Sequence, residues 1–371
     1  MRITIITSPF CELPPDAIGA VERCWANTAV EFARQGHRVE LLGKKGRTIL
    51  QSEGNLTRTY VRGYERTRSV YLDIVLDLVY SIRALWRMRQ CEVLVCNTFW
   101  TPILAHIMFR WKYKKLVYNV ARFPKCHMRA YRGVDLFACT SSSVRIALVN
   151  MFPQFADRAV VVSNPIDVRV FNVSRGRSSA VAGRIGYHGR VHVEKGLDIL
   201  AEAIGRIAKE CPQVSLRLVG PVDIARGGSG EAYRRKLDEL SGGRIEWCPP
   251  VSDPKRLAEL LRECESYCYP SVAEKGETFG VSPLEAMGLG LPVVVSRLEC
   301  FSDFVKADEN GLVFDHRSAD CVRQLVDKLR ALCLDHSLRK RLSCAAAKTA
   351  SGFTVESIAA RYVQEFEGLM K

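Results

Sequence analysis

Two carboxylates stand eight positions apart in the most informative stretch of the chain. They are Glu277 and Glu285, and Gly280 and the pair Ser282-Pro283 lie between them. Serine is a preferred N-cap and proline suits the first position of a helix, so the pattern predicts a short helix that begins here. Because the amides at a helix start bind anionic oxygens, we expect this stretch to bind phosphate or sugar oxygens.

A simpler interpretation of both carboxylates stays open. The spacing Ser282-x-x-Glu285 is also that of a capping box, in which the glutamate bonds only the backbone amide of the serine. Glu277, taken alone, would be an ordinary solvated loop carboxylate.

A second motif, Gly-Arg-Val-His-Val-Glu-Lys-Gly, occupies residues 189–196, between a predicted strand and a predicted helix. Arg190 and Lys195 could converge on one diphosphate, with the arginine gripping two oxygens and the lysine acting as a point charge. Two basic residues at a helix start are otherwise usually solvated. The carboxylates later in the chain favour the binding interpretation.

A third motif is the loop after the first predicted strand, which contains Pro14, Pro15, Asp16 and Gly19. A glycine there lets the backbone approach a ligand phosphate. The loop lacks the full G-x-G-x-x-G spacing, so dinucleotide redox chemistry is not supported.

Short β-rich runs alternate with longer amphipathic segments, which is typical of βαβ units around parallel sheets. In the N-terminal half we predict a helix at residues 18–35 and strands at residues 2–7, 39–42, 92–96, 115–119 and 135–140. The pattern restarts near residue 181, with strands at residues 184–189, 214–220, 245–248, 266–269 and 292–296. Residues 164–179 are the best linker candidate. The sequence therefore predicts an α/β protein of two doubly wound domains that face a cleft, with ligands at the carboxyl ends of the strands.

Length and composition agree with two domains, because a chain of 371 residues exceeds what one core usually supports. No apolar run reaches the roughly 18 residues of a membrane-spanning helix, and residues 2–7 fit a first strand better than a signal peptide. Without a secretion signal we expect a cytoplasmic protein whose 14 cysteines, which include no C-x-x-C pair, stay reduced.

The net charge of +14 is concentrated in the N-terminal half. Residues 1–170 contain 25 Lys and Arg against 13 Asp and Glu, so an anionic partner should meet this half. Residues 105–115 interleave aromatic and basic side chains, which is typical of a helix on an anionic membrane surface, or of a partly buried helix with solvated charges. No nucleic-acid recognition module is present, and a nucleic-acid partner is not expected.

The motifs and their order resemble family 4 glycosyltransferases, which have the GT-B fold. The resemblance is carried by Gly19, by residues 189–196, by GETFGVSPLEAMGLGLPVVVS at residues 276–296 and by NGLVF at residues 310–314. It implies an acceptor-binding Rossmann-like domain at residues 1–170, onto which the last helix, within residues 355–371, packs back. It also implies a domain at residues 171–354 that binds a nucleotide-diphosphate sugar, and transfer with retention at the anomeric carbon.

The resemblance also implies roles for individual residues. Arg190 and Lys195 would hold the diphosphate, Glu277 would touch the hydroxyls of the donor sugar, Glu285 would hold the ribose hydroxyls, and Gly19 would approach the diphosphate from the other domain. The donor site would further include four consecutive residues, of which the middle two supply amides: Thr278, Phe279, Gly280 and Val281.

Many glycosyltransferases neutralise the departing diphosphate with a metal held by an Asp-x-Asp motif, and this chain contains none. Arg190 and Lys195, together with Glu277, are therefore the expected catalytic residues, with no metal and no cofactor. Many family members also place a histidine after the strand that corresponds to residues 115–119. Here Asn119 and Arg122 occupy that region, and we assign them to the acceptor side.

The leading hypothesis is a metal-independent retaining hexosyltransferase, with a UDP-sugar as the first donor to test. The acceptor would be a glycan or glycolipid of surface polysaccharide or lipopolysaccharide biosynthesis, and the enzyme would lie on the inner face of the plasma membrane. Two alternatives stay open: a GT-B protein that binds nucleotide sugars without catalysis, and a nucleotide-sugar epimerase of related fold.

Overall fold

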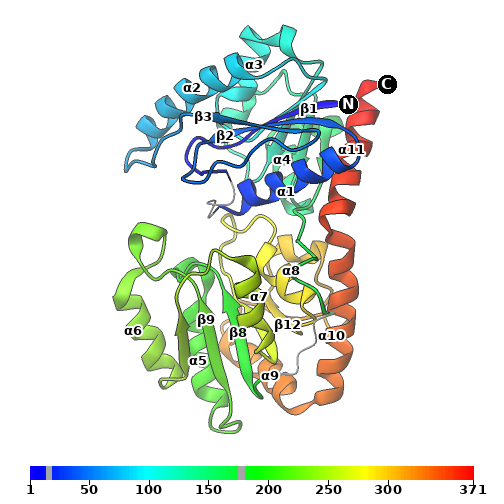
Figure 1. Ribbon diagram of the computed structural model, residues 1–371. Helices are drawn as coiled ribbons and strands as arrows, with labels where there is room; N and C mark the ends of the chain where they lie inside the picture. The colour runs from blue at the N-terminus through cyan, green and yellow to red at the C-terminus, as the bar shows by residue number, and fades with distance from the viewer. Residues whose placement is uncertain (14–18, 174–179) are drawn as a thin grey trace. The chain divides into compact units, whose positions relative to one another are not determined.

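The chain folds into two compact units, Met1–Pro165 with Val355–Lys371 and Ile166–Thr354, which we call unit 1 and unit 2. The computed structural model describes residues 1–13, 19–173 and 180–371 (Figure 1). The boundary between the units falls inside the predicted linker. The loop residues Pro14, Pro15 and Asp16 and the linker residues 174–179 lie outside the described residues.

Unit 1 is built on a parallel sheet of seven strands in the order β3-β2-β1-β4-β5-β6-β7. The strands are β1 (Arg2–Ile6), β2 (Arg38–Lys44), β3 (Leu56–Val61), β4 (Val93–Cys96), β5 (Lys115–Val120), β6 (Leu136–Cys139) and β7 (Ala159–Val161). Strands such as β4, with the sequence VLVC, are buried along their whole length, because helices cover both faces of a parallel sheet. The sequence did not reveal β3, an edge strand of sequence LTRTYV whose four central residues are only partly buried.

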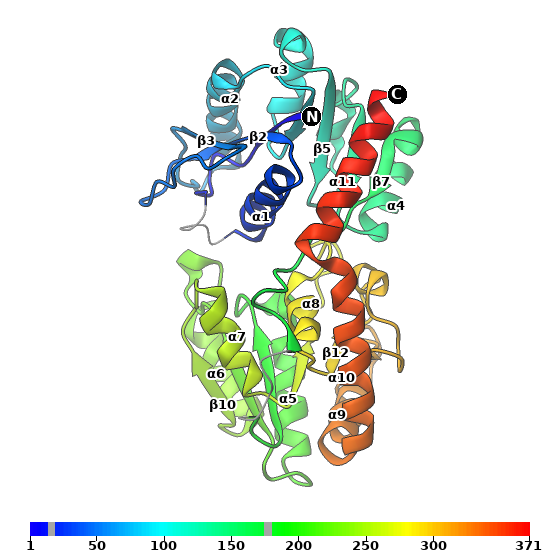
Figure 2. The same ribbon diagram turned by 45° about the vertical axis from the view of Figure 1, so that its right-hand side comes forward.

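The helices of unit 1 are α1 (Ala20–Arg34), α2 (Val70–Arg87), α3 (Thr101–Met108), α4 (Ser142–Met151) and α11 (Val355–Met370). The last of these, α11, packs beside α1 (Figure 2). The rings of Trp25 and Tyr362 lie 5.0 Å apart, and those of Phe32 and Phe366 lie 5.9 Å apart. An aromatic contact therefore fixes the C-terminal helix on unit 1. No helix in the described part of the chain is both long and apolar enough to cross a bilayer.

Unit 2 contains a parallel sheet of six strands in the order β10-β9-β8-β11-β12-β13. The strands are β8 (Arg184–His188), β9 (Ser215–Val219), β10 (Ile245–Cys248), β11 (Ser266–Tyr269), β12 (Val293–Ser296) and β13 (Leu312–Phe314). The helices are α5 (Leu197–Ile207), α6 (Gly230–Ser241), α7 (Pro254–Arg262), α8 (Val281–Gly288), α9 (Cys321–Leu334) and α10 (His336–Ala350). Both units are doubly wound parallel α/β structures, so the predicted fold class is confirmed.

The strand order of unit 2 reverses between β8 and β11, which pair with each other. In doubly wound sheets the connections on the two sides of this switch point leave in opposite directions, and ligands bind beyond the carboxyl ends of the strands there. The segment after β8 contains Arg190 and Lys195, and the segment after β11 contains Glu277. The topology therefore places both motifs of the sequence analysis at one edge of one sheet.

Candidate functional site

Lys195 and Glu277 form a buried ion pair at the switch point of unit 2. The distance from Lys195 Nζ to Glu277 Oε2 is 2.7 Å, and the two side chains are 8% and 12% exposed. Each residue comes from the loop after its own strand, 82 positions apart in the chain. The structure thus joins the two motifs that the sequence could only place near each other.

Tyr269, the last residue of β11, packs against this pair. Its hydroxyl donates to Glu277 Oε2 over 3.1 Å, and its ring lies 5.6 Å from Lys195 Nζ. Tyr187 stacks on the Tyr269 ring, with centroids 5.5 Å apart. Burial, and next the charge of Glu277, raise the pKa of Tyr269 well above its usual value, so its hydroxyl keeps the proton that it donates.

Glu285 is held by a histidine that the sequence analysis did not single out. His188, at the end of β8, places its Nε2 2.9 Å from Glu285 Oε2, and Tyr267 contacts the ring Nδ1 through its hydroxyl at 3.1 Å. Tyr267 and Tyr269 are separated by two positions on β11, so both side chains point to the same face of the sheet. The alternation of tyrosines at the end of a switch-point strand is the signal that could have revealed these residues.

The structure corrects the predicted start of the helix that carries Glu285. Helix α8 begins at Val281, and its N-cap is Gly280 rather than Ser282. Gly280 adopts a left-handed conformation with φ of 92°, and a Cβ atom there would lie 2.5 Å from the ring of Phe301. Only glycine fits this turn. The capping-box interpretation is wrong as well, because no side chain caps α8 and Glu285 binds His188 instead.

The loops after β8 and β11 are bonded to each other. The carbonyl oxygen of Glu194 accepts from the Val272 amide at 3.0 Å and from the Ser271 hydroxyl at 3.3 Å. Gly196 has φ of 62°, and a Cβ atom there would lie 2.3 Å from the Pro270 carbonyl oxygen. These backbone contacts hold Lys195 and Glu277 in register before any ligand is present.

A second set of contacts, made by Glu274, fixes the loop that carries Glu277. Glu274 accepts from His316 Nε2 and from the Arg317 guanidinium, each at 2.8 Å, and these bonds lower the pKa of Glu274 although burial opposes them. Both partners follow β13 in the chain. The loop after β11 is thus anchored both to the loop after β8 and to the segment after β13.

Arg190 is not part of the buried pair. Its side chain is 47% exposed, and its guanidinium lies 2.5 Å from Glu194, four residues further along the same loop. Arg190 and Lys195 share this loop, and the contact between Arg190 and the diphosphate stays a prediction.

The remaining predicted donor-site residues surround the start of α8. Phe279 is buried at 1% exposure and packs on Phe304, so its side chain belongs to the core and only its backbone can face a ligand. Thr278 and Val281 are partly buried. Their contacts with a donor stay predictions.

The predicted residues of unit 1 lie near the carboxyl ends of its strands. Gly19 is the N-cap of α1, and Arg122 is exposed after β5. Asn119 is buried near the end of β5 and donates from Nδ2 to Asn97 Oδ1 over 2.8 Å. Its Oδ1 atom is buried and has no hydrogen-bond partner among the described residues. The roles of Gly19, Asn119 and Arg122 stay predictions.

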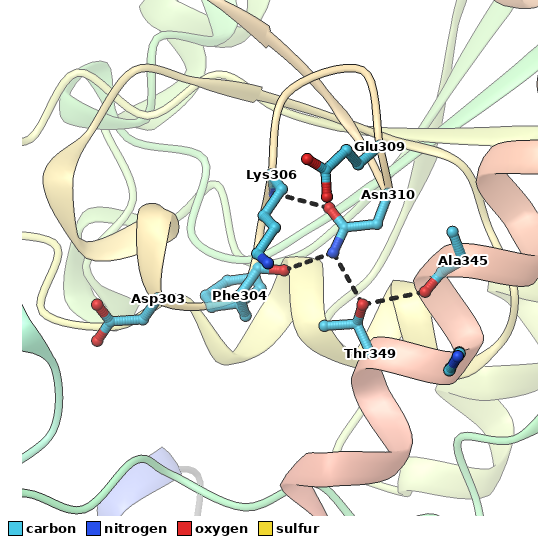
Figure 3. Close-up of a pocket in the computed structure, with 8 residues that line it drawn as sticks. Asp303, Phe304, Lys306, Glu309, Asn310, Ala345 and Thr349 are labelled. Carbon is cyan, nitrogen blue, oxygen red and sulfur yellow. Dashed lines mark hydrogen bonds between the residues drawn. The ribbon is translucent and has the colours of Figure 1, made fainter.

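Asn310, the first residue of the NGLVF motif, lines a pocket of about 460 Å³ in unit 2 (Figure 3). Asn310 donates from its amide to the Phe304 carbonyl and to the Thr349 hydroxyl, and accepts from the Lys306 amide. Figure 3 shows that the bond to Thr349 joins the loop before β13 to α10, whereas the other two bonds lie within the loop. Asn310 therefore has a structural role here.

No group of three or more metal-ligating side chains occurs among residues 1–13, 19–173 and 180–371. The cysteines of these residues are free thiols. Burial raises the pKa of those that the sheets enclose, for example Cys264 to about 12, so these thiols pack as apolar groups.

Two doubly wound units of this kind define the GT-B fold, and solved structures share it. A glycosyltransferase from Rickettsia africae is 15% identical with a TM-score of 0.76, over 100% of this chain and 98% of that one. Sucrose-phosphate synthase from Thermosynechococcus elongatus is 16% identical with a TM-score of 0.77, over 100% and 99%. Anabaena HepE in complex with UDP-glucose is 19% identical with a TM-score of 0.74, over 99% and 100%.

Two family models divide the chain between them. The model described as Glycosyltransferase Family 4 matches residues 19–170, and the model described as Glycosyl transferases group 1 matches residues 182–335. The chain therefore belongs to the family 4 glycosyltransferases.

Curated relatives carry the name D-inositol 3-phosphate glycosyltransferase. The protein from Nocardioides sp. is 26% identical over 76% of this chain and 65% of its own length. The protein from Streptomyces bingchenggensis is 28% identical over 60% of this chain and 50% of its own length. The matches to these two relatives thus span between half and two thirds of their length.

Proposed function

We propose that the protein transfers a hexosyl unit from a nucleotide-diphosphate sugar to a glycan or glycolipid acceptor, with retention of configuration and without a metal ion. The observation that carries the proposal is the buried Lys195–Glu277 pair at the switch point of unit 2. A lysine and a carboxylate that are already desolvated and fixed suit a ligand with a diphosphate beside a sugar.

The chemistry of the donor explains the need for such a pair. When the bond between the anomeric carbon and the phosphate oxygen breaks, negative charge develops on the diphosphate. Positive charge fixed where that charge develops lowers the barrier. In the proposal Lys195 supplies this charge, and Arg190 adds a second cation by exchanging its contact with Glu194 for the diphosphate.

The carboxylates would recognise the neutral parts of the donor. Glu277, oriented by Lys195 and the Tyr269 hydroxyl, has a second oxygen that can accept from the sugar hydroxyls. Glu285, oriented by His188, is assigned to the ribose hydroxyls. In a retaining front-face reaction the leaving diphosphate takes the proton of the acceptor, so no further base is required.

The donor and acceptor classes rest on different supports. Anabaena HepE binds UDP-glucose, which makes UDP-sugars the first donors to test. The names of the curated relatives specify a phosphorylated acceptor, and the basic composition of residues 1–170 would suit an anionic glycan or glycolipid. We propose surface polysaccharide or lipopolysaccharide biosynthesis as the setting, with the enzyme peripheral on the inner face of the plasma membrane.

The test is the slow hydrolysis of a panel of UDP-, GDP- and ADP-sugars, followed by transfer with candidate acceptors. An active transferase releases free nucleotide from one donor of the panel, and the anomeric configuration of the product reports retention. A protein that binds nucleotide sugars without catalysis would be stabilised against unfolding by the donor but would produce no free nucleotide from it. An epimerase would convert the sugar of the donor while the nucleotide stays attached.

A further inference from the structure

The outward face of α2 is a feature of unit 1 that the proposed chemistry leaves unused. Helical spacing places Tyr71, Val75 and Trp86 within about 60° of one another around the axis of α2. These side chains belong to residues that are 85%, 53% and 65% exposed. The buried face of the same helix carries apolar side chains as well as the polar Asp77 and Ser81. This helix therefore turns large apolar side chains toward the solvent.

A buried lysine, Lys112, joins the end of α2 to the segment that follows α3. Lys112 Nζ donates to the carbonyl oxygens of Leu85, Trp86 and Met88 at 2.9, 2.7 and 3.0 Å, and so caps the end of α2. The Trp86 ring then meets Phe109 edge-on at 5.6 Å. Figures 1 and 2 show α2 and α3 side by side.

The capped end of α2 thus adjoins three further exposed apolar residues. They are Ile107 at 71%, Met108 at 55% and Trp111 at 63% exposed. We call the exposed side chains of these three residues and of Tyr71, Val75 and Trp86 the α2–α3 surface. Large exposed apolar side chains that gather on neighbouring elements mark an interaction site.

The charge around the α2–α3 surface selects the partner. Residues 70–115, which carry the whole surface, contain seven Lys and Arg against three acidic residues, Asp73, Asp77 and Glu92. The exposed cations among them are Arg87, Arg89, Arg110 and Lys114. A second copy of this chain would bring these like charges together, which is unfavourable. An anionic surface would instead gain from both the cations and the apolar side chains.

We propose that the α2–α3 surface docks on the headgroup region of an anionic bilayer leaflet. Tryptophan prefers the boundary between headgroups and acyl chains, and arginine and lysine side chains reach the phosphates above it. One weak signal gives only marginal membrane binding, and two together give stable binding. The α2–α3 surface combines an apolar and an electrostatic signal. It lies outside the Lys195–Glu277 site, and it rests on the membrane location proposed above, for which it specifies the contact.

The full chain is tested by sedimentation with vesicles of phosphatidylcholine alone and with vesicles that also contain phosphatidylglycerol. We expect binding to the anionic vesicles that weakens between 0.1 M and 1 M salt, because the Debye length falls from about 10 Å to 3 Å. Trp86→Ala with Trp111→Ala should lower the partition coefficient about tenfold or more. Arg87→Glu with Arg89→Glu should lower it at 0.1 M salt.

The matched control is Ile224→Ala with Leu334→Ala, which removes two apolar residues of unit 2 that are 75% and 65% exposed. This control should bind like the natural chain. Equal binding to both kinds of vesicle, or unchanged binding of the double tryptophan variant, would overturn the proposal. A dimer in solution that dissociates on Trp86→Ala would also overturn it, because the surface would then be an interface between copies.

Discussion

His188 and Glu285 form a buried pair across the switch point of unit 2, with the ring Nε2 2.9 Å from the carboxylate oxygen. A carboxylate only accepts hydrogen bonds, so Nε2 donates to it, and the ring Nδ1 lies 3.1 Å from the Tyr267 hydroxyl. The two side chains are 8% and 12% exposed. The chain thus fixes one oxygen of Glu285 before a ligand arrives, and a preorganised group binds with a smaller loss of side-chain freedom.

We predict that His188→Phe raises the KM for the donor about tenfold, because one hydrogen bond to a charged group contributes about 1.5–3 kcal/mol. The value of kcat should change less, since the ribose lies away from the bond that breaks. Steady-state kinetics with the natural donor and with its ribose-deoxy analogue measure both effects.

His188→Gln is the matched control for that variant, because a glutamine amide can still donate to Glu285. It should keep more of the donor affinity than His188→Phe. If the natural chain and His188→Phe lose the same affinity on removal of the ribose hydroxyls, His188 does not act through Glu285.

Variants of the Lys195–Glu277 pair should change the free energy of unfolding and the catalytic rate independently of each other. Lys195→Ala should lower kcat by about 10² to 10³, the usual cost of removing a group that stabilises developing charge. It should also lower the free energy of unfolding by about 1–3 kcal/mol, because Glu277 loses its partner while buried. Adding Glu277→Gln should restore stability and leave activity low, which denaturant unfolding and donor hydrolysis would show.

An exposed ion pair offers the control. Arg206 and Glu202 lie 2.5 Å apart on α5 with side chains 56% and 37% exposed. Arg206→Ala should cost at most about 1 kcal/mol and should leave turnover unchanged. Near-normal turnover in Lys195→Ala would remove the proposed mechanism.

Much of the fold could be predicted because parallel strands buried on both faces form continuous apolar runs. The strand at residues 266–269 was predicted with the bounds that β11 has. Strand β3, with the consecutive polar residues Thr57, Arg58 and Thr59, carries no such signal. The start of α8 was misplaced for a different reason. Ser282 has the residue type of an N-cap, which is why the helix start was predicted there. The requirement for glycine at position 280 comes from Phe301, which lies 21 positions later and is invisible to a local sequence pattern.

The candidate site could be predicted at the level of motifs but not of partners. Spacing identified Lys195 and Glu277, and the strand order then brought them within 2.7 Å. No local rule connects His188 with Glu285, which stands 97 positions later, because their contact depends on the strand order. Arg190 belongs to the same motif as Lys195, but its side chain contacts Glu194 rather than Glu277. The motif position alone did not predict this contact.

Gly280→Ala tests the turn that begins α8. A non-glycine residue at φ of 92° and a Cβ atom 2.5 Å from Phe301 should together cost at least about 2 kcal/mol of unfolding free energy. Gly368→Ala in α11 is the control, because nothing lies within 4 Å of its Cβ position. Alanine favours a helix interior by about 1 kcal/mol, so this variant should be as stable as the natural chain or more stable. Equal unfolding midpoints for the two variants would contradict the described turn.

The burial of Glu22 predicts a pH-dependent gain of stability in Glu22→Gln. Glu22 is 5% exposed on α1, and burial raises its pKa above the usual value of about 4.3, although hydrogen bonds and cations oppose the shift. A carboxyl whose pKa is raised on folding contributes stability below the unfolded pKa and loses it as the pH rises through the folded pKa. Glutamine stays neutral, so the variant should melt higher than the natural chain at about pH 7 and alike below about pH 4. A difference of the same size at both pH values would contradict this explanation.

The last prediction concerns the source of positive charge in the reaction. Because Lys195 and Arg190 are proposed to neutralise the departing diphosphate, EDTA should leave the rate of donor hydrolysis within about twofold of its value without chelator. Added Mg²⁺ or Mn²⁺ should have no larger effect. Arg190→Ala, which removes an exposed cation and leaves the buried pair intact, should lower kcat about tenfold or more without changing the unfolding midpoint. A loss of activity in EDTA that Mg²⁺ restores would show that a divalent ion, rather than these two side chains, neutralises the leaving group.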